Sequence, residues 1–383
     1  MGERTGEGVS TMRAMVLHTP GPIETAPLWL EELPVPEPGP GEVRVKVRYC
    51  GVCRTDLHIV EGELVPPRLP LVPGHQVVGI VDAVGGTRGA GEAGRQGRHS
   101  QTSLSGQPGG RERPGVPAQP ESLLGRRVGV PWLYGTCGKC DYCRSGMENL
   151  CEAIAFTGFS VDGGYEEYTI AAADYLVRLP DGFSDLEAAP LLCAGIIGYR
   201  SIKVAGIERG DTVGLFGFGA SAHLAIQILR HMDCQVLVFT RGKQHQELAL
   251  KLGASWAGRP EDGREGKCDR AITFAPSRAV IPQALRALRR GGTLAINAVH
   301  LEKVPEMDYG LIYWEKKIVT VANSTRQDAD ELVRLAAKIP LEVSTEVYPL
   351  ADANRALLDL KGGRIQGEAV LEVSRNGVER AGG

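Results

Sequence analysis

The first part of the chain alternates short apolar runs with glycine and proline, a pattern typical of β-strands joined by turns. The clearest predicted strands are residues 14–18, 42–50 and 76–84. A Pro-Glu-Pro-Gly-Pro-Gly run at 36–41 separates the first of these strands from the second. We therefore expect a β-rich domain in this part of the chain.

From Asp211 the pattern changes to an apolar strand, a glycine turn and a helix, repeated along the chain. Strands alternating with helices predict a parallel sheet covered by helices. The predicted strands are residues 212–216, 235–240, 271–274 and 293–298, and the predicted helices are residues 223–229, 244–252 and 280–288.

The first of these turns reads Gly217-Phe218-Gly219-Ala220-Ser221-Ala222, a spacing typical of dinucleotide-binding units. Gly217 permits the tight turn, Gly219 lets the backbone approach a pyrophosphate, and Ala222 allows close packing of the helix on the strand. The pyrophosphate would lie at the N-terminus of the following helix, beside Ala220. The alternative is an α/β domain that binds no nucleotide.

The second strand of this unit ends without the Asp or Glu that holds the ribose 2′-hydroxyl of NAD. Thr240 and Arg241 stand there instead, and both can donate hydrogen bonds to a 2′-phosphate. We therefore predict NADP(H) in preference to NAD(H). The alternative for Arg241 is a solvated cation that stacks on adenine.

Residues 87–122 contain mostly Gly, Arg, Gln, Ser and Pro without an apolar rhythm. Such a composition buries too little apolar surface to offset the entropy of ordering. We expect a flexible surface insertion, with a partner-binding arm as the alternative because the segment carries several arginines.

Length and charge indicate an ordinary water-soluble enzyme. The 383 residues suit about two domains, and a net charge of −3 gives no reason to expect nucleic acid or an anionic membrane as partner. The nearly apolar stretch at 188–198 is too short to cross a bilayer, and the N-terminus lacks the apolar core of a signal peptide. We expect a cytoplasmic location.

Four cysteines with gaps of two, two and seven residues form the clearest chemical motif: Cys137, Cys140, Cys143 and Cys151. This spacing lets one small lobe, residues 135–152, wrap four thiolates around a tetrahedral zinc ion. Four protein ligands leave no open coordination position, so such a zinc is structural. A disulfide-linked loop and an iron–sulfur cluster are the alternatives.

Three further segments carry chemistry: Cys50-Gly-Val-Cys-Arg-Thr-Asp-Leu-His58, Pro73-Gly-His-Gln76 and Pro190-Leu-Leu-Cys-Ala-Gly195. With the four cysteines and the glycine turn, the sequence resembles the zinc-dependent alcohol dehydrogenases of the medium-chain dehydrogenase/reductase family from about residue 15 to 373. Val130-Pro-Trp-Leu133 and Phe156-Thr-Gly158 resemble the bacterial propanol-preferring and cinnamyl-alcohol-type members.

The resemblance implies an α/β and β fold, in which a GroES-like β-rich catalytic domain carries an inserted Rossmann domain with a doubly wound parallel sheet. We expect the catalytic domain at 1–193 and 324–383 and the Rossmann domain at 194–323.

The resemblance also implies a second, catalytic zinc ion held by Cys53, His75 and Cys193, giving two zinc ions per chain. Three protein ligands leave the fourth position to water or substrate. Cys193 also borders the cofactor, and Arg54 would contact its pyrophosphate. For Cys53 the alternative is a plain buried thiol.

A proton relay follows from the same resemblance. Thr55 would bond the substrate oxygen, His58 would release the proton to solvent, and Asp56 would orient the ligating His75. The alternatives are a surface histidine at 58 and a turn-capping residue at 56. Family members usually carry Gly-His-Glu where this chain has Gln76, and we expect the enzyme to remain active despite that change.

Trp132 and Leu64 would form the walls of an alcohol pocket, with core packing as the alternative for Trp132. The predicted activity is reversible hydride transfer between a primary aliphatic or aromatic alcohol and NAD(P)⁺. The alternatives are a zinc-free enone or quinone reductase of the same family and an inactive nucleotide-binding structural or regulatory protein. From the resemblance we also expect a homodimer or homotetramer.

Overall fold

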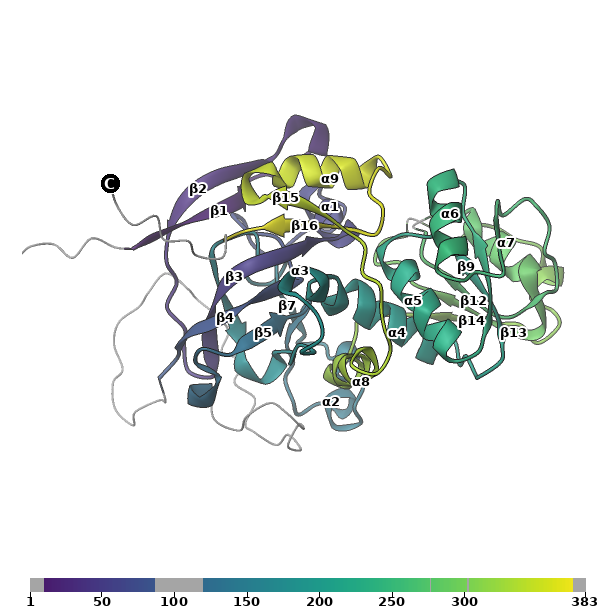
Figure 1. The fold of residues 1–383 in the computed structure, drawn as a ribbon, viewed down its shortest axis with the longest axis horizontal. Helices are drawn as coiled ribbons and strands as arrows, with labels where there is room; N and C mark the ends of the chain where they lie inside the picture. The colour runs from purple at the N-terminus through teal and green to yellow at the C-terminus, as the bar shows by residue number, and fades with distance from the viewer. Residues whose placement is uncertain (1–9, 87–119, 276, 302, 375–383) are drawn as a thin grey trace, which may run out of the picture.

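The computed structural model describes residues 10–86, 120–275, 277–301 and 303–374, which form two lobes (Figure 1). One lobe combines the N-terminal part of the chain with its C-terminal strands and the helix α9 (Ala353–Lys361). The other is built from the middle of the chain around a parallel sheet. In the described part of the chain, no helix has the length and apolar character needed to cross a membrane.

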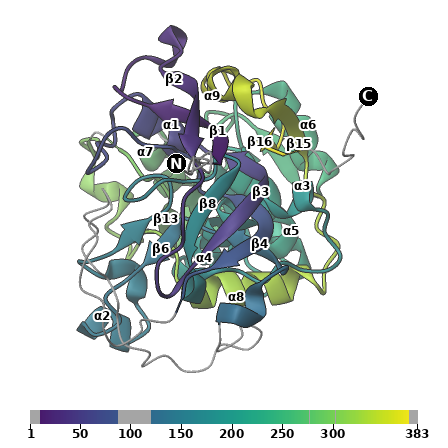
Figure 2. The same cartoon turned by 90° about the vertical axis from the view of Figure 1, so that its left-hand side faces the viewer.

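The first lobe, here called the catalytic lobe, is organised around the long strand β3 (Glu42–Val52). This strand pairs antiparallel with β4, β8 and β16, and Figure 2 shows it between β4 and β8. Alternate residues of β3 are fully buried, as expected for a strand with one face on a core. The other strands of this sheet are β4 (Val77–Val84), β5 (Arg127–Val130), β8 (Tyr168–Ala172), β15 (Thr345–Pro349) and β16 (Glu368–Glu372).

Smaller elements complete the catalytic lobe. A hairpin of β1 and β2 and the short pair of β6 and β7 flank the main sheet. Their bounds are β1 (Thr11–Leu17), β2 (Leu28–Pro34), β6 (Leu133–Gly135) and β7 (Ala155–Phe156), with helices α1 (Arg54–Val60), α2 (Asp141–Arg144) and α3 (Asp185–Ala188). The 3₁₀ helices of the chain are η1 (Ile23–Thr25), η2 (Pro120–Leu123), η3 (Glu148–Leu150), η4 (Ala173–Tyr175), η5 (Pro190–Leu192), η6 (Tyr309–Leu311) and η7 (Leu350–Asp352).

The second lobe, here called the nucleotide lobe, contains a parallel sheet in the order β11-β10-β9-β12-β13-β14. The order reverses between β9 and β12, and sheets of this kind bind ligands at the carboxyl ends of the strands at such a switch point. The strands are β9 (Thr212–Phe216), β10 (Gln235–Phe239), β11 (Trp256–Gly258), β12 (Cys268–Thr273), β13 (Leu288–Ile296) and β14 (Lys317–Thr320), and the helices are α4 (Ala194–Val204), α5 (Ala220–His231), α6 (Lys243–Lys251), α7 (Val280–Ala287) and α8 (Arg326–Ala336).

The lobes are joined by apolar packing around α4. Residues of α4, α5 and α8 share one buried cluster with Leu191, Leu192 and Val78 of the catalytic lobe. A separate buried cluster lies under β3 and β4. The helix α8 packs on α4 although the sequence assigns it to the catalytic domain. The domain boundaries near 194 and 323 stay a prediction.

The predicted fold class is confirmed, with differences at element ends. The predicted helix 223–229 is longer at both ends as α5, and the predicted strand 293–298 begins earlier and ends at Ile296 as β13. The predicted insertion at 87–122 falls largely outside the described residues, and its last residues belong to η2.

Candidate active site and metal centres

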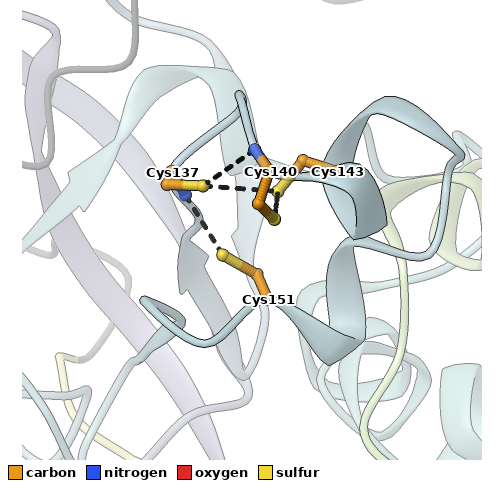
Figure 3. Close-up of side chains that lie close together, drawn as sticks. All are labelled: Cys137, Cys140, Cys143 and Cys151. Carbon is orange, nitrogen blue, oxygen red and sulfur yellow. Dashed lines mark hydrogen bonds between the residues drawn. The ribbon is translucent and has the colours of Figure 1, made fainter.

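The four cysteines of the 137–151 motif converge on one point (Figure 3). One ligand atom from each of them lies within 4.8 Å of every other. Cys140 precedes the first turn of α2 and Cys151 follows η3, so two short helical turns set their positions. The Sγ atoms of Cys140 and Cys143 are 3.5 Å apart, and those of Cys137 and Cys143 are 3.9 Å apart.

Backbone groups around this cluster favour a thiolate. The N–H groups of Lys139 and Cys140 lower the pKa of Cys137 to about 6, and the Cys140 N–H lies 3.4 Å from the Cys137 sulfur. Burial raises the pKa of Cys151 to about 12. Four sulfurs at these separations suit a tetrahedral zinc ion, which would deprotonate all of them.

The second cluster joins Cys53, His75 and Cys193, whose ligand atoms all lie within 4.8 Å of one another. Cys53 precedes α1, and Cys193 precedes α4 at the point where the chain enters the nucleotide lobe. Their Sγ atoms are 4.0 Å apart, and the hydrogen bond from Cys193 holds the pKa of Cys53 well below its ordinary value. Cys53 therefore has the thiolate character that a metal ligand needs.

Asp56 holds the ring of His75 and the backbone of Cys53 in position. Its carboxylate accepts hydrogen bonds from Nδ1 of His75 at 2.9 Å, from the backbone N–H of Cys53 at 2.9 Å and from the Tyr165 hydroxyl at 3.2 Å. Burial alone would lower the pKa of His75, but Asp56 and Cys53 raise it to about 10. The Asp56 bond fixes Nδ1 as the donor and raises the basicity of Nε2, which would give up its proton when it binds a metal ion.

The residues present fit a zinc ion. Nε2 of His75 is buried and has no hydrogen-bond partner among the described residues, and it faces the two sulfurs. Buried polar atoms are rarely left unpaired, so this nitrogen requires an explanation, and a bound cation provides one. One imidazole and two thiolates form a three-ligand set of the kind that catalytic zinc uses.

The proposed relay residues lie on α1 beside this cluster. Oγ1 of Thr55 is 3.7 Å from Sγ of Cys53, and Thr55 is buried. His58 is one turn further along α1, where its Nδ1 pairs with Glu63 and its ring lies 5.7 Å from that of His300. Thr55 thus contacts the metal cluster, whereas His58 lies one turn away from it with Glu63 and His300 as its neighbours.

Trp132 forms an aromatic wall next to His75. The two rings meet edge to face with centroids 4.8 Å apart, and Trp132 also stacks on Phe156 at 4.6 Å. Leu64 is partly buried and packs on the core of the catalytic lobe. Arg54 begins α1, and its guanidinium donates to the carbonyl of Leu360 at 3.3 Å.

The glycine turn stands between β9 and α5. Gly217 has φ of 90°, and a Cβ there would approach the backbone nitrogen of Ala275 to 2.8 Å, so this position needs glycine. Apart from its chain neighbours, no described residue has an atom within 4 Å of a Cβ built on Gly219, which leaves space above the start of α5. Ala220 begins that helix, and Ala222 is fully buried against the sheet.

The end of β10 is followed by the two residues expected to contact the 2′-phosphate of NADP, Thr240 and Arg241. Thr240 is nearly buried, and its backbone is held by Gly258 and by the side chain of Gln246. Arg241 is exposed, and its guanidinium lies 3.4 Å from Oε1 of Glu261. This loose surface contact leaves Arg241 able to turn to an anionic ligand.

Several residues of the site were missed from the sequence. Tyr165 bonds Asp56, Glu63 pairs with His58, and Glu368 is a buried acid behind the cluster. Each comes from a segment outside the motifs, so no local spacing pointed to it. The only sequence signal was the presence of polar residues in otherwise apolar strand patterns, as at Glu368.

Comparisons with known proteins give matches along most of the chain. The family model described as "Alcohol dehydrogenase GroES-like domain" matches residues 39–99 and 115–181, and that described as "Zinc-binding dehydrogenase" matches residues 222–338. The probable alcohol dehydrogenase AdhA of Mycobacterium tuberculosis is 44% identical, covering 94% of this chain and 97% of the relative.

Two solved structures share the fold over nearly the whole chain. A cobalt- and zinc-bound thermostable alcohol dehydrogenase from Pyrobaculum aerophilum is 26% identical with a TM-score of 0.78, covering 95% of this chain and all of that one. Acetophenone reductase from Geotrichum candidum in complex with NAD is 25% identical with a TM-score of 0.78, covering 96% and 98%.

The two lobes, with a parallel sheet whose order reverses between β9 and β12, are those of a dehydrogenase with a Rossmann unit. The chain belongs to the zinc-dependent alcohol dehydrogenases of the medium-chain dehydrogenase/reductase family. It is an oxidoreductase of the zinc type that uses a nicotinamide cofactor. The zinc-free reductase and the inactive nucleotide-binding protein are not favoured.

Proposed function

We propose that the protein catalyses reversible hydride transfer between a primary aliphatic or aromatic alcohol and NADP⁺, with one catalytic and one structural zinc ion per chain. The observation that carries this proposal is the convergence of Cys53, His75 and Cys193, with Nε2 of His75 unpaired among the described residues. The cluster stands where the catalytic lobe meets α4, close to the nucleotide lobe.

The chain's own residues divide the work. A bound zinc ion supplies the Lewis acidity that makes the alcohol hydroxyl more acidic, and a bound nicotinamide supplies the hydride acceptor. Thr55 is placed to hold the substrate hydroxyl, since its Oγ1 is 3.7 Å from the Cys53 sulfur. His58 takes the proton towards solvent, with Glu63 holding its ring. Asp56 accepts the hydrogen bond from Nδ1 of His75 and so directs Nε2 towards the metal position.

A preference for NADP over NAD is supported by the end of β10. Thr240 and Arg241 follow the strand where a carboxylate would select NAD. Arg241 is paired only with Glu261 among the described residues and can exchange that exposed contact for a 2′-phosphate.

A substrate of modest width is supported by the aromatic wall. Trp132 lies against His75 and Phe156, and this stack closes one side of the space next to the metal ligands. Leu64 offers a smaller wall from the segment after α1. An aliphatic or benzylic primary alcohol fits these surroundings better than a steroid or a polyol.

A homodimer or homotetramer is supported by the exposed edge of the nucleotide lobe. The strand β14 ends the sheet order, so one side of it has no paired strand among the described residues. Four large side chains near this edge are exposed, namely Tyr309, Tyr313, Trp314 and Ile318. An open edge flanked by apolar side chains is a surface that a second copy can cover.

A cytoplasmic location is supported by the cysteines. All nine are free, and the seven of the two clusters must be reduced to bind metal. A reducing compartment keeps thiols in that state.

The test is an alcohol panel measured with NADP⁺ and with NAD⁺, following reduced nicotinamide at 340 nm. We expect turnover of primary aliphatic and benzylic alcohols, with kcat/KM higher for NADP⁺. Turnover that depends on an enone and not on any alcohol would contradict the proposal.

A further inference from the structure

A buried carboxyl group stands behind the catalytic cluster without a partner. Glu368 begins β16 and is 2% exposed, and neither of its oxygens has a hydrogen-bond partner among the described residues. Removing a carboxyl group from water without a compensating interaction costs free energy, so the burial of Glu368 requires a physical explanation.

The register of the sheet places Glu368 beside a metal ligand. In the antiparallel pair of β3 and β16, Ala369 lies opposite Val52 and Val370 opposite Gly51. Glu368 precedes Ala369 and Cys53 follows Val52, so both residues adjoin the same end of this ladder. The acid therefore stands on β16, next to the end of β3 that leads to the metal cluster.

Gln76, the residue before β4, approaches the same place. It is fully buried, and both polar atoms of its side chain lack hydrogen-bond partners among the described residues. A Cβ built on Gly51 would lie 2.7 Å from Nε2 of Gln76 and 2.8 Å from Oε1 of Glu368. The Gln76 amide and the Glu368 carboxyl thus share the small space over Gly51. Gln76 follows the ligand His75 in the sequence, and Gly51 lies two residues before the ligand Cys53.

The charges of the cluster act on this acid. Burial raises the pKa of Glu368 well above its ordinary value, and the Cys53 thiolate adds to that effect. The Gln76 amide and His75 act in the opposite sense, although no hydrogen bond of ordinary geometry joins Gln76 to Glu368. The geometry shows that the Glu368 carboxyl shares the space over Gly51 with Gln76, the residue after His75, and a cation held by His75 and Cys53 would favour its ionised form.

We propose that Glu368 supplies the carboxylate that Gln76 lacks to the metal centre of Cys53, His75 and Cys193. It holds the ion electrostatically and offers an oxygen donor when another ligand leaves. This inference rests on the catalytic metal site of the proposed function. The family usually carries a carboxylate directly after the ligating histidine, where this chain has Gln76, whereas Glu368 stands on β16, on the other side of β3 from β4.

The direct test is the rate at which a chelator removes metal from the fully loaded protein. Glu368→Gln keeps the shape of the side chain and removes its charge. We expect metal affinity at the catalytic site to fall about 10- to 100-fold, the range seen when groups behind a metal ligand are lost. The chelator should therefore remove metal from this site faster than from the parent. Metal held by Cys137, Cys140, Cys143 and Cys151 should leave at the parent rate and serves as the internal reference.

A second measurement uses the protein loaded with Co²⁺, whose visible spectrum reports ligand geometry. Glu368→Gln should change the band of the catalytic site. The matched control is Glu166→Gln, which removes another buried acid of the same lobe, one surrounded by Asp162, Arg68 and Thr169. This control should keep both the release rate and the spectrum of the parent.

A double variant distinguishes a role of Glu368 in metal binding from a role in packing. Adding Gln76→Glu to Glu368→Gln returns one carboxylate to the same space and should restore slow metal release. Parent-like release and an unchanged Co²⁺ spectrum in Glu368→Gln would overturn the inference while leaving the proposed function intact. A parent protein that holds no metal at the catalytic cluster would overturn both, before any variant is made.

Discussion

The indole Nε1 of Trp132 donates a hydrogen bond of 3.2 Å to Oδ1 of Asn323. Asn323 has φ of 51° and lies between β14 and α8, where the chain leaves the parallel sheet. Asparagine tolerates this left-handed conformation better than most residues. The aromatic wall beside His75 is thus tied to the segment that links the two lobes.

Trp132→Phe should therefore weaken catalysis by loosening that wall. The variant keeps an aromatic ring and loses one hydrogen bond, worth about 1 kcal/mol, which corresponds to roughly a fivefold fall in kcat/KM for a small primary alcohol. Steady-state kinetics check this, with Trp29→Phe as the control because Trp29 is 65% exposed on β2. An equal loss in both variants would contradict the assigned role.

Asp56→Asn should weaken zinc binding at the catalytic cluster. An amide cannot hold Nδ1–H of His75 and the Cys53 N–H as a carboxylate does, so we expect zinc affinity there to fall about 10- to 100-fold. Competition with a chelator measures the affinity. Tyr165→Phe removes only one hydrogen bond to the same carboxylate and should cost less than Asp56→Asn. Unchanged affinity in Asp56→Asn would show that His75 needs no such partner.

Arg241→Ala should remove the preference for NADP. Loss of a charge-assisted contact worth about 1.5–3 kcal/mol predicts roughly a 10- to 100-fold lower kcat/KM with NADP⁺ and little change with NAD⁺. Lys251→Ala, at the far end of α6 and also exposed, is the control. If Arg241→Ala lowers kcat/KM equally for both cofactors, Arg241 does not read the 2′-phosphate.

Asp328 joins α8 to α4 and makes stability depend on pH. It is buried and pairs with Arg200 at 2.7 Å and Lys203 at 2.9 Å. Burial raises its pKa, but Thr325, Lys203 and Arg200 together bring the pKa below its ordinary value. Since the folded state then holds the carboxylate better than the unfolded state, the stabilisation is present at neutral pH and is lost as pH falls through the lowered pKa.

Asp328→Asn should consequently destabilise the protein at pH 7 by about 3 kcal/mol, because it leaves two cations without their buried partner. The difference from the parent should begin to shrink below about pH 4, where the carboxylate of the unfolded chain takes up a proton, and should be lost as pH falls through the lowered pKa of the folded protein. Urea unfolding at several pH values measures both quantities. A difference that stays constant with pH would exclude an electrostatic origin.

Local sequence patterns predicted the elements where one signal dominates. The strand 212–216 was predicted with the bounds of β9 because a short apolar run stands between Asp211 and Gly217. The strand β13 begins earlier than predicted because residues 289–292, Arg-Arg-Gly-Gly, have the composition of a turn but stand inside the strand. They form an irregularity between the pairs Cys268–Leu288 and Arg270–Thr293, where Gly291 has φ of 74°, so the turn-like composition marks a break in the register and not the start of the strand.

The residues of the site were likewise predicted where a local pattern exists and missed where none does. Both cysteine clusters were predicted because metal ligands leave a pattern of residue types and spacings. Tyr165, Asn323 and Glu368 were missed because each reaches the site through the pairing of distant segments. Such contacts depend on sheet register, which a single sequence does not display.

Zinc content per chain tests the central claim most directly. Elemental analysis of the purified protein should give two zinc ions per chain, with one remaining in Cys53→Ala and one remaining in Cys143→Ala. Only Cys53→Ala should lose alcohol-dependent reduction of NADP⁺ while keeping the structural zinc. A parent with one zinc ion that persists in Cys53→Ala and disappears in Cys143→Ala would contradict the account.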